Sequence, residues 1–215
     1  MTAGNSSQNF KATDFERAAN DWYVEPRWCV EALADVMPLV DGSYVWDPCC
    51  GGGTIPSVFA DRLGQHRVIA TDIVNRGYLH FAEEWDAIKF GTPASVMPGM
   101  RVNIVTNPPF KLAERIVRRA LALADHRVAI LQGLQFLASA GRHALFTEFP
   151  PSEVLILSRR PSMPPGHLIA EMGDKAFKGG VTDFCWIIWN APHDRETRVR
   201  WLDPKPTTTN EGAMI

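Results

Sequence analysis

The segment spanning residues 44–54 reads YVWDPCCGGGT: a short apolar run, an acidic residue and a turn with three consecutive glycines. The β-branched and aromatic residues at its start predict a buried strand. Glycines directly after a strand let the backbone approach a ligand that any Cβ would exclude, and they tolerate positive φ. The segment therefore predicts a strand that ends at a ligand-binding turn, with a purely structural tight turn as the alternative.

The alternation of apolar runs and turns continues along the chain as far as residue 132. Apolar runs that predict further strands lie at 67–71, 102–106 and 127–131, and helical spacing follows at 54–63 and after residue 110. A helix is also expected within 73–88, with another strand at 88–90 or 95–97. Because parallel strands are connected by right-handed crossovers, this order predicts a parallel sheet with helices on both of its faces.

The C-terminal part contains two more apolar runs, at 154–157 and 184–189, without an obvious helix of ten or more residues between them. We expect them to pair antiparallel at one edge of the sheet, with Trp186 and Trp189 in the core. The intervening segment 158–182 is rich in proline and glycine, and loops of this length are usually functional. We therefore expect it to lie on the substrate side of the protein.

The composition indicates one ordinary globular domain. The chain has 215 residues, of which 46% are hydrophobic, and a formal net charge of −2. These values exclude wholesale disorder and leave no room for a second large core. The predicted fold class is α/β, with a mostly parallel seven-stranded sheet and an antiparallel edge strand. We expect a flexible arm at 1–20, a single domain over 21–193 and a tail over 194–215.

Several further classes of protein are excluded by local sequence. No window approaches the roughly 18 to 20 apolar residues of a membrane span, and residues 1–13 lack the apolar core of a signal peptide. We therefore expect a cytoplasmic protein without a membrane partner. The four cysteines and six histidines lack the spacing of metal ligands, so no metal site is predicted. The oligomeric state stays open.

An acidic residue supports a nucleotide-like ligand at the glycine turn. Asp72 follows Gly53 by 19 residues and ends the next predicted strand. A carboxylate at this place can accept hydrogen bonds from both hydroxyls of a ribose. No phosphate-loop lysine follows the glycines, which disfavours a nucleoside triphosphate. The pair predicts a cofactor that contains adenosine.

A second turn, Asn107-Pro108-Pro109-Phe110, ends the predicted strand at 102–106. The two prolines hold φ at about −65° and have no amide hydrogen, so the turn offers mainly carbonyl groups. The side-chain oxygen of Asn107 and the carbonyl of Pro108 can both accept from a planar NH2 group, and Phe110 can stack on the attached ring. Such hydrogen bonds would expose the lone pair of a poorly nucleophilic amine. An Asx-type turn that merely closes a strand is the alternative.

Both turns resemble those of class I S-adenosylmethionine-dependent amino-methyltransferases, which have a Rossmann-like methyltransferase fold. Residues 47–54 match the family motif Asp-Pro-x-x-Gly-x-Gly-Thr, and residues 107–110 match [Asn/Asp]-Pro-Pro-[Tyr/Phe]. The resemblance covers about residues 20–190. Segments at 142–146, 150–151, 159–163 and 184–189 follow in an order similar to that of small phage and bacterial DNA N6-adenine methyltransferases.

The resemblance implies a role for each matching residue. Those implied in binding S-adenosylmethionine are Trp22, Tyr23, Pro26, Asp47, Pro48, Cys49, Gly51, Gly53, Thr54, Asp72, Ile73 and Asn107. In the family, a Thr-Pro or Ser-Pro segment before the first strand also touches the cofactor, and here it reads Glu25-Pro26. An ionised glutamate cannot donate to the cofactor carboxylate, so Tyr23 or Trp22 is expected to make this contact.

Catalysis would be achieved by positioning, without an enzyme nucleophile. The catalytic residues implied are Asn107, Pro108, Pro109 and Phe110, and those expected to bind substrate are Phe110, Lys111, Arg159, Arg160, Lys175 and Lys178. The basic residues flank the long loop and suit the phosphates of a nucleic acid, with an ordinary solvated surface as the alternative.

We therefore predict methyl transfer from S-adenosylmethionine to the 6-amino group of adenine in DNA, with the base turned out of the duplex. RNA adenine and a protein glutamine amide are alternative substrates, since both present a planar NH2 group. A non-catalytic binding module with the same fold is the alternative from a different class.

Overall fold

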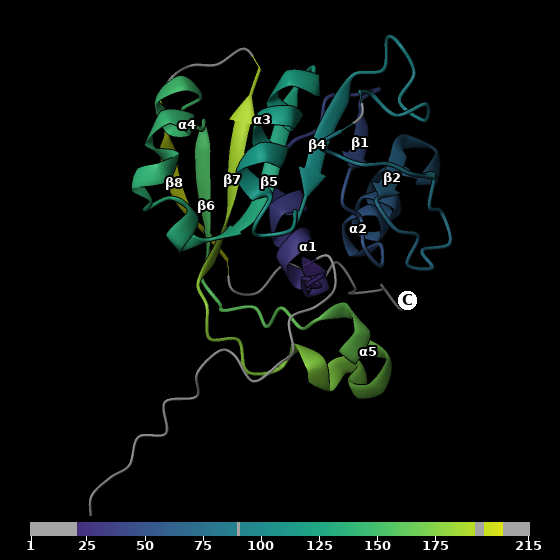
Figure 1. Ribbon diagram of the computed structural model, residues 1–215, viewed down its shortest axis with the longest axis vertical. Coiled ribbons are helices and arrows are strands. Elements are labelled where there is room, and N and C mark those ends of the chain that lie inside the picture. The colour runs from purple at the N-terminus through teal and green to yellow at the C-terminus, as the bar shows by residue number, and fades with distance from the viewer. Residues whose placement is uncertain (1–20, 90, 192–195, 204–215) are drawn as a thin grey trace, which may run out of the picture.

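The computed structural model describes residues 21–89, 91–191 and 196–203, so the predicted N-terminal arm lies outside the described residues. Eight described strands form one sheet in the order β3-β2-β1-β4-β5-β7-β6-β8 (Figure 1). The strands are β1 (Tyr44–Asp47), β2 (Val68–Asp72), β3 (Glu83–Glu84), β4 (Val102–Thr106), β5 (Arg127–Gly133), β6 (Glu153–Leu157), β7 (Phe184–Asn190) and β8 (Arg198–Leu202). The helices are α1 (Arg27–Val36), α2 (Thr54–Leu63), α3 (Ala113–Leu123), α4 (His143–Glu148) and α5 (Gly166–Met172). The predicted α/β class is confirmed.

The parallel part of the sheet reverses its order beside β1. The chain runs outward from β1 to β2 and β3, and then crosses back to β4, which pairs with the other side of β1. In open parallel sheets, ligands bind at such a switch point, outside the carboxyl ends of the strands. The glycine turn follows β1 and the Asn107 turn follows β4, so the topology brings the two turns together.

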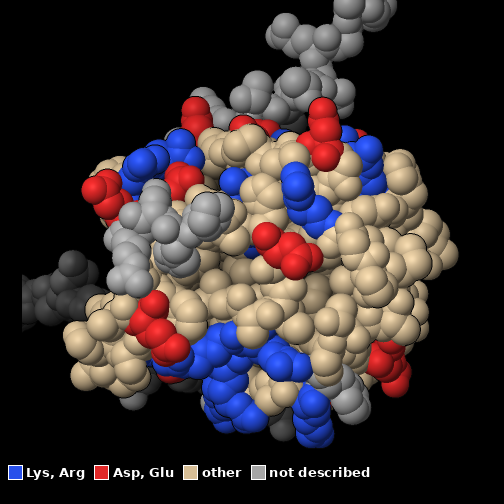
Figure 2. Space-filling view, turned by 90° about the horizontal axis from the view of Figure 1, so that it is seen from above, with Lys and Arg blue, Asp and Glu red and all other residues tan. Residues whose placement is uncertain are grey.

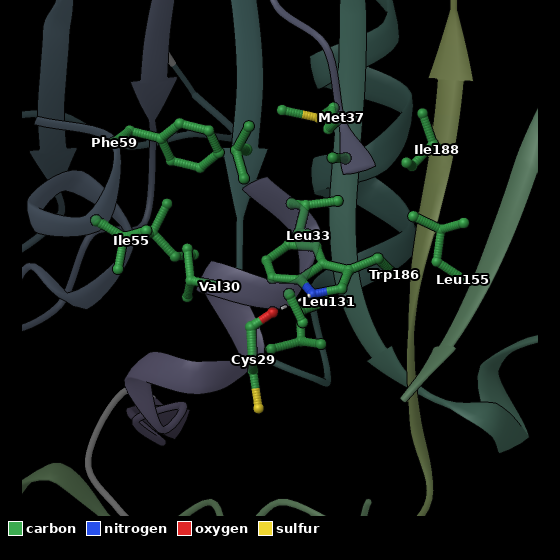
Figure 3. Close-up of a cluster of buried hydrophobic side chains, with 14 of the residues drawn as sticks. Cys29, Val30, Leu33, Met37, Ile55, Phe59, Leu131, Leu155, Trp186 and Ile188 are labelled. Carbon is green, nitrogen blue, oxygen red and sulfur yellow. Dashed lines mark hydrogen bonds between the residues drawn. The ribbon is translucent and has the colours of Figure 1, made fainter. Parts of the chain in front are cut away.

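Helices cover both faces of the sheet, as predicted. One apolar cluster joins α1 and α2 to one face, and a second cluster joins α3 and α4 to the other. In the first cluster, the indole nitrogen of Trp186 donates to the carbonyl of Cys29 at 2.9 Å, which satisfies the polar atom of a fully buried ring (Figure 3). On the other face, Trp189 is equally buried and donates to the carbonyl of Phe149. The predicted core positions of both tryptophans are confirmed.

Helix α2 shows how the glycine turn leads into regular structure. Gly53 precedes the helix with φ 89°, and Pro56 lies in its first turn, where the missing amide hydrogen costs no hydrogen bond. Ile55, Val58 and Phe59 form the buried face. The helix coincides with the predicted range 54–63.

The segment after β2 differs from the prediction, because it contains turns and no helix. Asn75 accepts a hydrogen bond from the backbone of Gly77, which has φ 85°, and Asp86 accepts from the backbone of Ile88 and Lys89. Such Asx turns compete with helix and strand hydrogen bonds. The predicted helix within 73–88 and the strands at 88–90 or 95–97 are therefore wrong, and the third strand is the two-residue β3.

The C-terminal strands differ from the prediction in their positions. Strands β6 and β7 are antiparallel as expected, but β7 lies between β5 and β6, and the edge strand is β8. Residues 198–202, which we assigned to the tail, thus belong to the sheet, and the strand count is eight. Of the other tail residues, 194–195 and 204–215 lie outside the described part.

The predicted loop 158–182 contains helix α5 and a 3-10 helix (Gly173–Phe177). Figure 1 shows α5 beyond the end of the sheet toward which β4 points. No helix in the described residues is both long enough and apolar enough to cross a bilayer.

Candidate active site

A pocket lies at the carboxyl ends of β1, β2 and β4 and brings the two sequence motifs together. The predicted site residues that line it are Trp22, Tyr23, Pro48, Cys49, Gly51, Thr54, Asp72, Ile73, Asn107, Pro108, Pro109 and Phe110. Pro26 and Gly53 line a neighbouring groove instead. Asp47, Lys111, Arg159, Arg160, Lys175 and Lys178 do not line the pocket.

The glycine turn forms one wall of the pocket. Gly51 has φ 52°, and a Cβ there would lie 2.7 Å from Nε1 of Trp22. A Cβ on Gly53, with φ 89°, would overlap the ring of Tyr78. Both positions therefore require glycine for conformation and for space, and that space is filled by side chains of the protein itself.

Two carboxylates hold this turn. Asp72 accepts a hydrogen bond from the backbone of Gly51 at 2.9 Å and another from Val74 at 3.2 Å, and it lines the pocket. Asp47 is buried beneath the turn, where one of its oxygens accepts from the backbone of Cys49, and burial raises its pKa well above the usual range. Asp72 is thus placed to meet a ligand, whereas Asp47 supports the turn from below.

Asn107 has a defined amide orientation. Its Nδ2 donates to a carboxylate oxygen of Glu25 at 2.8 Å and to the carbonyl of Tyr23 at 3.2 Å. Its Oδ1 is buried and has no hydrogen-bond partner among the described residues. Because Asn107 lines the pocket, the arrangement leaves a buried acceptor for a donor group on a ligand.

Glu25 is a site residue for which sequence reasoning had no role. Its side chain is buried and lines the pocket, and desolvation raises its pKa to about 7, partly offset by hydrogen bonds from Asn107 and Thr54. The sequence feature that could have indicated a buried role for Glu25 is its place after three apolar residues and immediately before a proline.

Aromatic rings surround the Asn107 turn. Phe110 stacks on Tyr23 with 5.6 Å between ring centroids, and Phe184 lies 6.2 Å from Phe110 on a tilted plane. The indole of Trp22 packs against Gly51 and Gly166, and the guanidinium of Arg76 lies 4.3 Å above it. The Nε1 of Trp22 is buried and has no partner among the described residues, so it is a second polar atom left for a ligand.

Arg76 and Trp85 also line the pocket and were missed in the sequence analysis. Arg76 follows the end of β2, and this place in a parallel sheet was the only signal for it. Asp86, which also lines the pocket, carries a lowered pKa because it accepts backbone hydrogen bonds and faces Lys89. Nothing in the sequence distinguishes Trp85 from an ordinary core residue.

The predicted substrate-binding cations lie outside the pocket in varied surroundings. Arg159 stacks over Trp28 at 4.1 Å, and Arg160 forms an ion pair with Asp183 at 2.7 Å. Lys175 and Lys178 are exposed near the end of the 158–182 segment. Lys111 is exposed as well. Their contact with a substrate stays a prediction.

The chemistry of the pocket does not depend on a thiol nucleophile. Cys49 and Cys50 line the pocket, but burial raises the pKa of both thiols well above the usual value, so they are uncharged at neutral pH. Among the residues that the structure describes, no group of three or more His, Cys, Asp or Glu side chains is placed to hold a metal ion.

No protein-family model and no curated protein matches this chain. Among solved structures, the methyltransferase subunit of a type I restriction-modification system from Streptococcus thermophilus is similar at 13% identity, with a TM-score of 0.63 over 86% of this chain and 48% of that one. A predicted O-methyltransferase from Agrobacterium tumefaciens is similar at 15% identity, with a TM-score of 0.52 over 86% of this chain and 91% of that one. The chain thus spans about half the length of the first of these proteins. At these identities the likeness concerns the fold, and the chain has the Rossmann-like methyltransferase fold that its sequence predicted.

Proposed function

We propose that the protein transfers the methyl group of S-adenosylmethionine to the 6-amino group of adenine in DNA. The observation that carries this proposal is the orientation of Asn107, a pocket-lining residue whose Oδ1 is buried without a partner while its Nδ2 is held by Glu25 and Tyr23. An unpaired buried acceptor is costly, and a donor such as an aryl NH2 group removes that cost.

The pocket residues fit S-adenosylmethionine. Asp72 would accept from the ribose, and the unpartnered Nε1 of Trp22, whose indole packs against Gly51, would donate to the carboxylate of the cofactor. When bound, S-adenosylmethionine supplies a methyl group on a positively charged sulfur. Buried carboxylates around the turn, Glu25 and Asp72, favour a cationic ligand of this kind.

The residues of the second turn would orient the amine. Asn107 Oδ1 and the Pro108 carbonyl would each accept one hydrogen of the NH2 group, which fixes the amine and exposes its lone pair. Phe110 and Tyr23 offer aromatic surface for the base. The rate enhancement would then come from orientation and from the exclusion of water, without a covalent enzyme intermediate.

DNA is the preferred substrate for two reasons. The structure with a TM-score of 0.63 is the methyltransferase subunit of a type I restriction-modification system. In addition, Lys175 and Lys178 are exposed on the segment that carries α5, at the end of the sheet where the pocket opens. Exposed cations beside a site suit the phosphates of a nucleic acid.

A substrate panel tests the proposal. The purified protein is incubated with S-adenosylmethionine labelled in its methyl group and, separately, with unmethylated DNA, structured RNA and a glutamine-containing protein. We expect label in DNA, recovered as N6-methyladenine after digestion to nucleosides. Label confined to RNA or protein would contradict the proposed substrate, and calorimetry without any heat of S-adenosylmethionine binding at millimolar concentration would contradict the proposed cofactor.

A further inference from the structure

The amide of Asn107 can present either of two faces to the pocket. A turn of 180° about the last side-chain bond exchanges Oδ1, an acceptor, with Nδ2, a donor. Only the first orientation can accept a hydrogen from an amine. The residues that decide the orientation therefore decide whether the pocket can hold an NH2 group productively.

Two groups accept from the Nδ2 of this amide, and they differ in kind. The Tyr23 carbonyl, at 3.2 Å, accepts whatever the pH. The Glu25 side chain, at 2.8 Å, is an acceptor at both oxygens while it is ionised, whereas protonation turns one of them into a donor. The shorter of the two contacts is thus made by the group whose character depends on its protonation state.

We propose that Glu25 is a positioning residue, whose carboxylate holds the amide of Asn107 with Oδ1 directed into the pocket. The inference rests on the proposed function, since it assigns the reason for the orientation that methyl transfer requires. Glu25 acts through Asn107, and it accounts for a glutamate at a position where a hydroxyl residue was expected to meet the cofactor.

The backbone around Glu25 is fixed on both sides, which makes the carboxylate a rigid support. The backbone amide of Val24 donates to the Pro164 carbonyl at 3.0 Å, and residue 23 forms a bridge with Pro165. Pro26 then begins helix α1 as its N-cap. Glu25 itself is only 7% exposed, so solvent cannot replace its contact with Asn107.

The pKa of Glu25 lies in the physiological pH range, so its protonation state changes there. Burial raises its pKa to about 7, and hydrogen bonds from Asn107 and Thr54 limit the rise. The titratable groups that face this region are Cys29, Asp47, Asp72, Asp21, Arg76, Asp86, Tyr23, Cys49 and Cys50. Burial, together with the nearby Glu25, raises the pKa values of Asp47 and Cys29, so neither adds a charge beside Glu25 at neutral pH. Protonation of Glu25 below about pH 7 should then weaken its hold on the amide and leave the Tyr23 carbonyl as the contact that does not depend on pH.

Nuclear magnetic resonance of the side-chain amide tests this directly in the intact protein. With 15N-labelled asparagine, we expect the Asn107 Nδ2 resonances to shift between pH 5.5 and 8.5 with a midpoint near 7, and not to shift in Glu25→Gln. An Asn107 signal that does not titrate in the wild type would overturn the inference. This readout needs neither substrate nor turnover, so it separates a failure of the positioning role from a failure of the proposed function.

Reciprocal exchange provides the second test. In Asn107→Asp, two carboxylates face each other, and activity should fall by about 100-fold. The variant Glu25→Gln should lower kcat by about tenfold and remove the acid limb of the pH profile. In the double variant the introduced amide can donate to the introduced carboxylate, whose other oxygen accepts from the substrate. We expect the double variant to regain at least about tenfold over Asn107→Asp. A double variant no more active than Asn107→Asp, with a normal far-ultraviolet spectrum, would contradict the positioning role.

Discussion

At the scale of single residues, the site combines groups that the sequence identified with one that it did not explain. The proline-framed turn predicted Asn107, because an amide after a parallel strand and before two prolines has few structural reasons to be there. The buried position of Glu25 could not be predicted in the same way. Its burial depends on residues around 164 and 165, far away in the sequence, which cover segment 23–26.

The raised pKa of Glu25 predicts a pH-dependent stability. Its pKa moves from 4.5 to about 7 on burial, so the folded state holds this proton more tightly than the unfolded chain does. The stabilisation is fully present below pH 4.5 and is lost as the pH rises through about 7. We therefore expect Glu25→Gln to raise the free energy of unfolding at pH 8 by about 1 to 3 kcal/mol, and to leave it nearly unchanged at pH 4.5.

Denaturant unfolding at the two pH values measures this difference. Glu31→Gln, on the partly exposed face of α1, is the matched control and should change the stability by less than about 0.5 kcal/mol at either pH. A Glu25→Gln protein that is less stable than the wild type at pH 8 would show that the ionised carboxylate is a net stabilising group.

At the scale of elements, the sequence predicted best where a strand was buried and its turn had a distinct chemistry. Strand β4 and helix α2 coincide with their predicted ranges, since a strand rich in β-branched residues and glycines on both sides of a helix leave few alternatives. The segment 73–88 misled because its apolar residues have helical spacing, whereas the Asx turn at Asn75 sets the backbone. Four of the five residues of strand β8 are exposed, so this strand lacks the buried apolar run by which other strands were predicted.

The turn between β1 and α2 gives an element-scale prediction. In Gly51→Ala, the added Cβ would lie 2.7 Å from Trp22 Nε1, in a residue with φ 52°. We expect the Kd for S-adenosylmethionine to rise by at least about tenfold, together with a loss of about 1 to 2 kcal/mol of stability from the left-handed backbone. Calorimetry and thermal unfolding report the two effects.

Gly42→Ala separates these two effects. Gly42 has φ 78°, and an added Cβ would have no atom within 4 Å. This variant should therefore lose a similar amount of stability and keep its affinity for the cofactor. Equal affinities in the two variants would mean that the position of the Trp22 indole against Gly51 does not affect cofactor binding.

At the scale of the whole molecule, the charge distribution does not by itself indicate a nucleic-acid-binding protein. The net charge is −2, and Figure 2 shows acidic and basic side chains interspersed on the end away from α5, apart from one basic group near the lower edge of the view. Under the proposed function, DNA would be held by local cations such as Lys175 and Lys178, which lie on the segment that carries α5. The composition could not show where those cations lie, because their position depends on how the 158–182 segment packs at the end of the sheet (Figure 1).

The proposed DNA contact predicts a change in salt dependence. Replacing Lys175 and Lys178 with alanine should weaken DNA binding at every sequence and lower the slope of log K against log salt by about 2, close to 0.9 per lost phosphate contact. Arg101→Ala, an exposed cation just before β4 at the other end of the sheet, is the control and should leave the slope unchanged. Fluorescence anisotropy from 50 to 200 mM salt measures the slope. An unchanged slope in the double variant would exclude these lysines from the DNA interface.

The central claim is that the oxygen of Asn107 orients an amine for methylation, and formation of N6-methyladenine in DNA by Asn107→Ala is its most direct measurement. The control is Asn190→Ala, which removes an amide bonded to Arg127 at 2.6 Å at the opposite end of the sheet. We expect kcat to fall by about 100-fold or more in Asn107→Ala and to stay within about threefold of wild type in Asn190→Ala, with the affinity for S-adenosylmethionine changed far less than kcat. Wild-type turnover in a folded Asn107→Ala protein would contradict the account.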